Sequence, residues 1–233
     1  PLEPGAVVRG EIAWTRRFDH MQQHTGQHML SAAFDRLLGV MTTSFHLGSD
    51  AVTIDLAREV SVKEIAGAEA MANDVVWDDR PVTVRFVDED AAARLPLRKK
   101  PARGGTLRLV EIPEFDLSAC GGTHVVRTGS VGIIAVTGVE RMKGASRVSF
   151  ACGGRALRSH GALRDVVIGA TRALSVVPDN IVAAIEKSQS ESRDAARVVK
   201  RLQDELARYR AVQLQATAEG IGPHRVVLCI DPD

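Results

Sequence analysis

The sequence predicts an α+β domain of mixed helices and antiparallel strands over residues 1–152, followed by a helical extension. Three observations lead to this class: a helical hydrophobic period near the N-terminus, short strand-like runs separated by glycine-bearing turns, and no strict alternation of strand with helix. Hydrophobic residues make up 45% of the 233 residues and charged residues 25%, proportions that are ordinary for a globular protein.

The first predicted helix spans residues 18–38. It contains no proline and one glycine, and its apolar residues recur in steps of three and four: Met21, Met29, Leu30, Ala33, Phe34, Leu37 and Leu38. We expect Asp19 to cap its start and Gly39 to end it in a left-handed conformation. Its polar positions carry the candidate chemistry.

The strand-like runs follow this helix. Residues 42–46 and 51–56 read as a hairpin around Gly48-Ser49-Asp50. Ser61 and Glu64 form a capping-box signature that opens a helix reaching to about Trp77. Further strands are expected after Pro81 and in three later runs, at 82–86, 107–112, 131–137 and 147–152.

The helical extension is expected over residues 153–218. A break at 177–180 divides it into two helices, and the second mixes apolar residues with many charges, as an exposed or coiled-coil-like helix does. Such a helix could support a homodimer or simply separate two domains. A strand-like run at 225–230 predicts that residues 219–233 begin a further domain, and Pro1 in first place indicates a trimmed chain.

The cysteines and the net charge limit the functions that the chain can have. Cys120, Cys152 and Cys229 are odd in number and far apart, which argues against a disulfide framework and for a reducing, cytoplasmic location. No apolar run approaches the roughly 20 residues of a membrane span. A net charge of +1 gives no global attraction for nucleic acid. A local basic patch remains, either a phosphate contact or a solvated loop: Arg98, Lys99, Lys100 and Arg103.

Two ligand pairs predict a zinc site. His24 and His28 are four residues apart on the first helix, so both imidazoles project from one face. Cys120 and His124 repeat this spacing in SACGGTH, where two glycines indicate a tight loop instead of a helix. Three nitrogens and one sulfur favour zinc over magnesium or calcium. His20 is left out, because eight residues rotate it away from His28.

The count of four ligands leaves the role of this zinc open. A zinc ion with four protein ligands is normally structural, whereas a catalytic one keeps a position for water or substrate. Either the metal accepts a fifth ligand, or one protein ligand is loose, or the metal orients the substrate while another group handles water. The sequence does not choose among these.

Three ordered motifs resemble a known family. RRFDHMQQHTGQHMLSAAF, SFHLGSDAVTIDL and FDLSACGGTHVVRTGSVG resemble the editing domain that alanyl-tRNA synthetases share with freestanding alanyl-tRNA editing proteins, a fold of the alanyl/threonyl-tRNA synthetase second additional domain type. The likeness covers roughly residues 7–157. It implies that His24, His28, Cys120 and His124 bind Zn²⁺, and that the chain hydrolyses the ester of tRNA for alanine wrongly charged with serine, with glycine as a further candidate.

Departures from the family pattern concern the amino-acid pocket. Many synthetases read HTATH where this chain reads HTGQH, so Gln27 replaces a pocket threonine, and His46 stands where synthetases often carry glutamine. A site that must spare alanine needs polar partners for the serine hydroxyl, and Thr25, Gln27, Ser44 and His46 are the candidates. The freestanding proteins look closer to this chain, which favours action in trans.

Two other functions fit the same residues. The chain could be the editing portion of a full alanyl-tRNA synthetase, although neither motif for amino-acid activation is visible in it. It could also be a tRNA-binding or oligomerisation module whose zinc is purely structural, as the closed ligand count and the long helical extension suggest. These alternatives differ in whether the metal takes part in hydrolysis.

Overall fold

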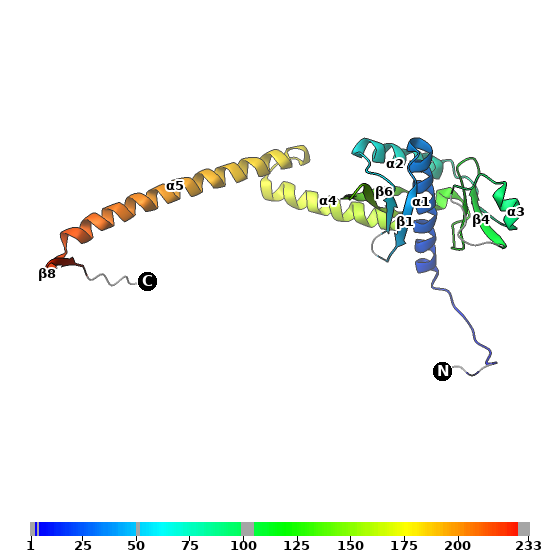
Figure 1. The fold of residues 1–233 in the computed structure, drawn as a ribbon, viewed down its shortest axis with the longest axis horizontal. Helices are drawn as coiled ribbons and strands as arrows, with labels where there is room; N and C mark the ends of the chain where they lie inside the picture. The colour runs from blue at the N-terminus through cyan, green and yellow to red at the C-terminus, as the bar shows by residue number, and fades with distance from the viewer. Residues whose placement is uncertain (1–2, 4, 50–51, 99–104, 228–233) are drawn as a thin grey trace. The chain divides into compact units, whose positions relative to one another are not determined.

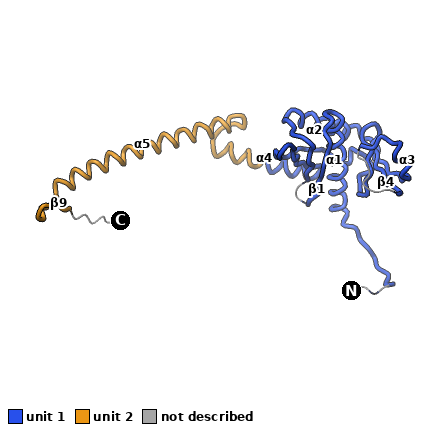
Figure 2. The backbone as a smooth tube through the Cα atoms, viewed as in Figure 1, with its two compact units in different colours: residues 1–163 blue, residues 164–233 orange. Residues whose placement is uncertain are grey.

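A computed structural model describes the chain apart from residues 1–2, 4, 50–51, 99–104 and 228–233 (Figure 1). The described residues form two compact units, residues 1–163 and 164–233 (Figure 2). The first unit is a mixture of helices and antiparallel sheets, which confirms the predicted class. The predicted boundary at residue 152 coincides with the end of a strand, while the first unit continues to Leu163.

The larger sheet of the first unit has four antiparallel strands in the order β1-β2-β7-β6. They are β1 (Thr42–Leu47), β2 (Val52–Leu56), β6 (Ile134–Met142) and β7 (Ala145–Cys152). The hairpin of β1 and β2 confirms the prediction. β6 begins later than expected, because the short 3-10 helix η1 (Thr128–Val131) and a turn at Gly132 (φ 85°) occupy its predicted start.

The smaller sheet has three antiparallel strands in the order β3-β4-β5. They are β3 (Thr83–Val87), β4 (Leu107–Ile112) and β5 (Asp116–Ala119), and the short helix α3 (Glu89–Ala93) follows β3. The sequence did not predict β5 or α3. β5 places Asp116 and Ser118 at its buried positions, so it lacks the apolar alternation that marks a strand.

Helix α1 (Trp14–Leu38) is the central element of the unit and stands between the two sheets in Figure 1. It begins four residues before the predicted start, so Asp19 does not cap it; Asp19 instead binds Arg155, with Oδ2 2.6 Å from Nη2. Gly39 ends the helix at φ 63°, as predicted. A left-handed residue at this place satisfies the last carbonyl groups of the helix.

The core of the unit lies where α1 meets the larger sheet and α2 (Val62–Trp77), whose capping box of Ser61 and Glu64 is confirmed. Residues 23–34 of α1 are all buried. Gly26 allows this close packing, because a Cβ at that position would overlap the sulfur of Cys152 on β7. The middle of α1, with both candidate histidines, is therefore fixed from several sides.

The remaining elements are α4 (Gly154–Leu174), which crosses the unit boundary, η2 (Pro178–Asn180), α5 (Ile181–Ala216) and the hairpin β8 (Glu219–Ile221) and β9 (His224–Val226). The break predicted at 177–180 is confirmed, and no residue of α5 is buried. The strand predicted at 225–230 lies partly outside the described residues. Among the described helices, none alone could cross a membrane by length and composition, and only α4 and α5 together, bent at their break, pass that test.

Candidate metal centre

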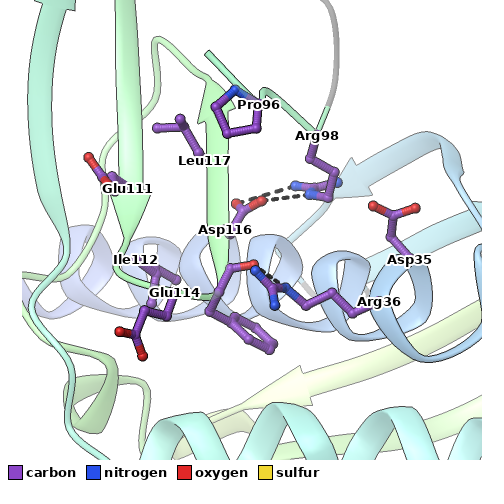
Figure 3. Close-up of a pocket in the computed structure, with 10 residues that line it drawn as sticks. Asp35, Arg36, Pro96, Arg98, Glu111, Ile112, Glu114, Asp116 and Leu117 are labelled. Atoms are coloured by element: carbon purple, nitrogen blue, oxygen red, sulfur yellow. Dashed lines mark hydrogen bonds and ion pairs between the residues drawn. The ribbon is translucent and has the colours of Figure 1, made fainter.

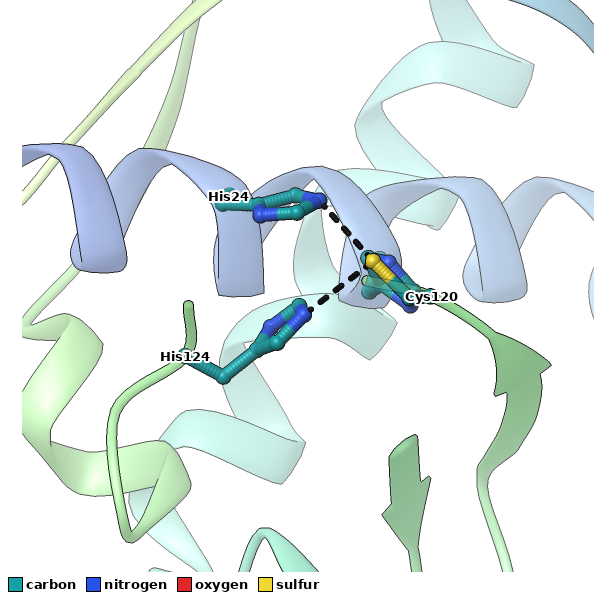
Figure 4. Close-up of side chains that lie close together, drawn as sticks. His24, Cys120 and His124 are labelled. Atoms are coloured by element: carbon teal, nitrogen blue, oxygen red, sulfur yellow. Dashed lines mark hydrogen bonds between the residues drawn. The ribbon is translucent and has the colours of Figure 1, made fainter. Parts of the chain in front are cut away.

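The four predicted ligands meet in one cluster. His24 and His28 come from α1, and Cys120 and His124 come from the loop that follows β5. Figure 4 shows His24, Cys120 and His124 pointing toward one another. Each offers one ligand atom, and these atoms all lie within 4.8 Å of one another. His24, His28 and His124 are buried and Cys120 is partly buried. Spacing and ligand chemistry predicted this set, the family resemblance supported it, and the fold brings the four residues together.

The loop approaches α1 closely because of a glycine. A Cβ on Gly122 would overlap the imidazole of His24, whereas one on Gly121 would meet open space. The loop that the two glycines predicted is confirmed, although neither glycine adopts a left-handed conformation. Gly122 provides room for the His24 ring, and Gly121 has no such neighbour.

The donor set fits a zinc ion. The sulfur of Cys120 lies 3.4 Å from Nε2 of His24 and 3.4 Å from Nε2 of His124. In a tetrahedral zinc site, ordinary Zn–S and Zn–N bonds separate sulfur from nitrogen by about 3.5 Å. Three imidazoles and a thiolate are also the softer ligands that zinc accepts. No magnesium or calcium site is built from such donors.

The cluster favours a thiolate at Cys120. Burial raises the pKa of this thiol, but hydrogen bonds with His124, His24 and His28 outweigh it and lower the pKa to about 3. The thiolate is the form that binds metals. By contrast, burial raises the pKa of the Cys152 thiol, which packs against α1 and has no imidazole beside it. Only Cys120 of these two cysteines is suited to metal binding.

Asp116 orients His28 through a hydrogen bond to its Nδ1 atom. Its Oδ2 lies 2.9 Å from Nδ1 of His28, which leaves Nε2 of that ring for a metal. The side chain of Asp116 is 1% exposed, and Nε of Arg98 donates to its Oδ1 at 2.6 Å. Burial raises the pKa of Asp116, but the bonds with His28 and Arg98 outweigh it and lower the pKa to about 2. Asp116 is thus a buried carboxylate between the imidazole of His28 and the guanidinium of Arg98.

Asp116 lines a cavity of about 330 Å³, here called the Asp116 cavity (Figure 3). Arg98 and Asp116 both line it, and the four candidate ligands do not. Ser118 completes the group, with its hydroxyl 2.9 Å from Oδ1 of Asp116 and 3.1 Å from Nη2 of Arg98. Sequence reasoning missed Asp116 and Ser118. Two polar residues at the buried positions of a short strand were the available signal.

Thr25 holds His124 in a similar way. Its hydroxyl oxygen is 3.2 Å from Nδ1 of His124 and accepts a hydrogen bond from the backbone N–H of Val125, also at 3.2 Å. Nε2 of His124 therefore faces the sulfur of Cys120. Thr25 is fully buried. Its contacts within the described residues are those of a support for His124.

A cavity of about 300 Å³, here called the Gln27 cavity, borders the cluster. Its lining residues are Gln27, His28, Thr42, Ser44, Phe45, Arg98, Ser118, Ala119, Cys120 and Gly121. Nε2 of Gln27 donates to the hydroxyl of Ser31 at 2.9 Å, while Oε1 is buried and has no hydrogen-bond partner among the described residues. Two metal-ligand candidates thus share a cavity with Gln27, whose buried Oε1 is without a hydrogen-bond partner among the described residues.

Two of the other predicted site residues line this cavity, Ser44 and Arg98, and His46 does not. Ser44 lines it and donates to Oδ2 of Asp55 at 2.5 Å. His46, on the same strand, is not among the lining residues. Arg98 lines it while bound to Asp116. The remaining predicted RNA contacts, Lys99, Lys100 and Arg103, lie outside the described residues.

Comparisons with known proteins agree with the motifs. Residues 107–149 match the family described as threonyl and alanyl tRNA synthetase second additional domain. An alanine–tRNA ligase of Pyrococcus abyssi is 33% identical over 97% of this chain and 26% of its own length. The alanyl-tRNA editing protein Aarsd1 of Rattus norvegicus is 35% identical over 83% of this chain and 48% of its own length.

The chain spans about a quarter of that ligase and about half of that editing protein. In both alignments the likeness covers most of this chain. Residues 107–149 therefore match the family described as threonyl and alanyl tRNA synthetase second additional domain, and most of the chain is similar to alanine–tRNA ligases and to alanyl-tRNA editing proteins.

Proposed function

We propose that this chain is a zinc-dependent deacylase that hydrolyses tRNA for alanine mischarged with serine, acting in trans. The observation that carries the proposal is the cluster of His24, His28, Cys120 and His124 at the edge of the Gln27 cavity. Its relatives include alanine–tRNA ligases and alanyl-tRNA editing proteins, and the name of the latter states an editing role. Glycyl-tRNA is the second substrate to test.

In this proposal the metal takes part in ester hydrolysis. A zinc ion held by these four residues would supply Lewis-acid polarisation of the ester or of a water molecule. His28 is kept in one orientation by Asp116, and His124 by Thr25, so both present Nε2 to the same point. Cys120 and His28 also line the Gln27 cavity, which gives a substrate access to the ligands.

Gln27 is the residue that we propose recognises the serine hydroxyl through a hydrogen bond. Its buried Oε1 lacks a donor among the described residues, and a hydroxyl in the Gln27 cavity would supply one. Alanine has no hydroxyl, so its binding would leave the acceptor unpaired, at a cost of about 1–3 kcal/mol. Ser31 fixes the amide by accepting from Gln27 Nε2 at 2.9 Å. Ser44 and His46 are proposed as further contacts.

The test combines metal analysis with hydrolysis assays. We expect one zinc per chain and loss of serine from seryl-tRNA for alanine, with alanyl-tRNA left intact. His24→Ala should lose both the metal and the hydrolysis. Gln27→Leu should keep the metal but lower seryl-tRNA hydrolysis roughly 10–100-fold, the equivalent of one lost hydrogen bond in a buried site.

The proposal fails if zinc-loaded wild type leaves seryl-tRNA intact as long as buffer does. Action in trans is tested in the same assay, because the isolated chain must then act on seryl-tRNA without a ligase. If hydrolysis requires an attached activating domain, the chain is instead the editing portion of an alanyl-tRNA synthetase.

A second candidate is a tRNA-binding or oligomerisation module with structural zinc. A full set of four protein ligands and a 36-residue helix without a buried residue favour it. In that case Cys120→Ala should lower the melting temperature sharply, and the wild type should show no hydrolysis. Melting curves recorded beside the deacylation assay separate the two functions.

A further inference from the structure

A second cavity meets the ligand loop at its other end. Cys120 and Gly121 line the Gln27 cavity, whereas Thr123 lines a different cavity of about 510 Å³, here called the Arg17 cavity. The rest of its lining comes from the start of α1 and the residues before it: Glu11, Ile12, Ala13, Arg16, Arg17 and His20. The candidate ligands therefore lie beside two separate hollows.

One helix face connects the Arg17 cavity to the metal cluster. His20 lies one turn before His24 on α1, and Arg16 and Arg17 lie one turn before His20. Arg17 lies seven residues before His24 and shares its helix face, whereas Arg16 lies eight residues before it and is rotated by about 80°. A rise of 1.5 Å per residue puts both arginines about 10–12 Å from His24 along the axis. A stripe of basic side chains thus leads away from the ligands.

The charge of this stripe is not neutralised by the protein. Arg16 and Arg17 are exposed and form no ion pair among the described residues. Glu11 is the only acid that lines the Arg17 cavity within the described part of the chain. Two arginines against one carboxylate leave a positive hollow that fits a chain of phosphates.

An exposed aromatic side chain, Trp14, precedes Arg17 by three residues on α1, a spacing that puts neighbouring side chains on one side of a helix. Trp14 is 62% exposed and stacks on Phe18, with ring centroids 6.1 Å apart. Large exposed aromatics beside basic grooves are the platforms on which unpaired bases stack. Trp14 occupies the first turn of α1, the same turn as Arg16 and Arg17.

We propose that the Arg17 cavity binds the sugar–phosphate backbone of the single-stranded 3′ end of the tRNA, with Arg16 and Arg17 on phosphates and Trp14 beneath a base. The inference rests on the proposed function, because it assumes that the ester lies at the metal ligands. The amino acid would then occupy the Gln27 cavity, and the nucleotides would follow α1 toward its N-terminus. The Gln27 cavity would thus bind the amino acid and the Arg17 cavity the nucleotides of the same substrate.

The experiment measures RNA binding separately from hydrolysis. A fluorescently labelled, uncharged hairpin RNA ending in single-stranded ACCA is titrated with zinc-loaded protein while anisotropy is recorded at several salt concentrations. The variants are Arg16→Gln with Arg17→Gln and, as a matched control, Arg141→Gln with Lys143→Gln at the exposed β6–β7 turn. Both double variants remove two positive charges from the surface of the first unit.

We expect the Arg16 and Arg17 double variant to bind the hairpin roughly tenfold more weakly, and its salt slope to fall by about 1.4, since each single-strand phosphate contact contributes about 0.7. The control should match wild type. Zinc content should be unchanged in both. Trp14→Leu should weaken binding with the salt slope unchanged, because stacking releases no counterions.

Equal binding by wild type and the Arg16 and Arg17 variant would overturn the inference, as would an equal loss in the control. Absence of hairpin binding by wild type at low salt would also overturn it. Hydrolysis of seryl adenosine, which has no phosphate, tests the proposed function alone: the double variant should retain it. If wild type hydrolyses neither seryl adenosine nor seryl-tRNA, the proposed deacylase function is refuted. The anisotropy data still test separately whether the Arg17 cavity binds RNA.

Discussion

Asp116 illustrates how much one residue contributes to the candidate centre. Its carboxylate is almost fully buried, and three side chains satisfy it: His28, Arg98 and Ser118. A buried charge needs such partners, since an unpaired one would cost several kcal/mol. The bond to His28 also fixes which ring nitrogen is free, and this is how carboxylates raise the affinity of histidine sites for zinc.

Asp116→Asn should therefore weaken zinc binding about 10–100-fold, the usual effect of removing a partner of a ligand. The measurement is competition for zinc against a chromophoric chelator. Asp35→Asn is the matched control, because Asp35 lines the same Asp116 cavity but contacts no candidate ligand among the described residues. If both variants bind zinc like wild type, Asp116 does not position His28.

The two loop glycines provide a sharper test of packing. Gly122→Ala puts a methyl group into the His24 ring, so the ring or the loop must move. We expect zinc affinity to fall at least tenfold, since ligands must be held within a fraction of an ångström. Gly121→Ala meets open space and should bind zinc like wild type. An equal loss in both variants would show that backbone freedom, not room for His24, is required.

At the scale of elements, an ion pair ties the strands of the larger sheet together. Arg147 on β7 donates to Asp55 on β2 at 2.7 Å, and Ser44 on β1 donates to the same carboxylate. The Arg147 guanidinium, followed by the Ser44 hydroxyl, lowers the pKa of Asp55 to about 2. Three adjacent strands thus share one charged group, close to the Gln27 cavity that Ser44 lines.

This lowered pKa predicts a pH-dependent stability. A carboxyl with a depressed pKa in the folded state stabilises the fold above its unfolded value of about 3.9, and the contribution disappears as pH falls toward 2. Asp55→Asn should lower the free energy of unfolding by about 1 kcal/mol at pH 7, a typical size for a partly exposed pair. Urea unfolding at pH 7, 4 and 3 should show this difference shrinking. A constant difference would contradict it, and exposed Asp165→Asn serves as control.

At the scale of the whole molecule, α5 carries an apolar seam. Val199, Leu202, Leu206 and Tyr209 recur in steps of three and four, and they are 52%, 53%, 53% and 71% exposed. Such a repeat is typical of a coiled coil. No residue of the helix is buried, so the apolar side chains of the seam have no partner within the described chain. A second copy of the chain is our proposed partner.

We expect sedimentation equilibrium to give a dimer mass at micromolar concentration. Leu202→Glu with Leu206→Glu should convert it to a monomer, because four charges would then lie in the dimer seam. Ala207→Glu with Ala211→Glu adds the same charge to the helix outside the seam and should remain dimeric. A monomer mass for wild type would remove the dimer proposal and leave α5 as a spacer.

The sequence alone determined the long helices, most strands and the four residues that cluster as candidate ligands, because these depend on local patterns. The period of α1 places His24 and His28 on one face, and the capping box and Gly39 mark helix ends. The N-terminus of α1 was misplaced because Asp19, a good cap, binds Arg155 instead, 136 positions away in the chain. Local propensity could not reveal such a partner.

Tertiary structure decided what each side chain near the ligands does. Thr25 and Gln27 are two residues apart, yet one supports His124, 99 positions away, and the other lines a cavity with an unused acceptor. Asp116 meets His28 across 88 positions. The physical reason is that burial and hydrogen bonding between distant segments assign these partners. Residue spacing identifies which side chains share a helix face, but packing determines what that face meets.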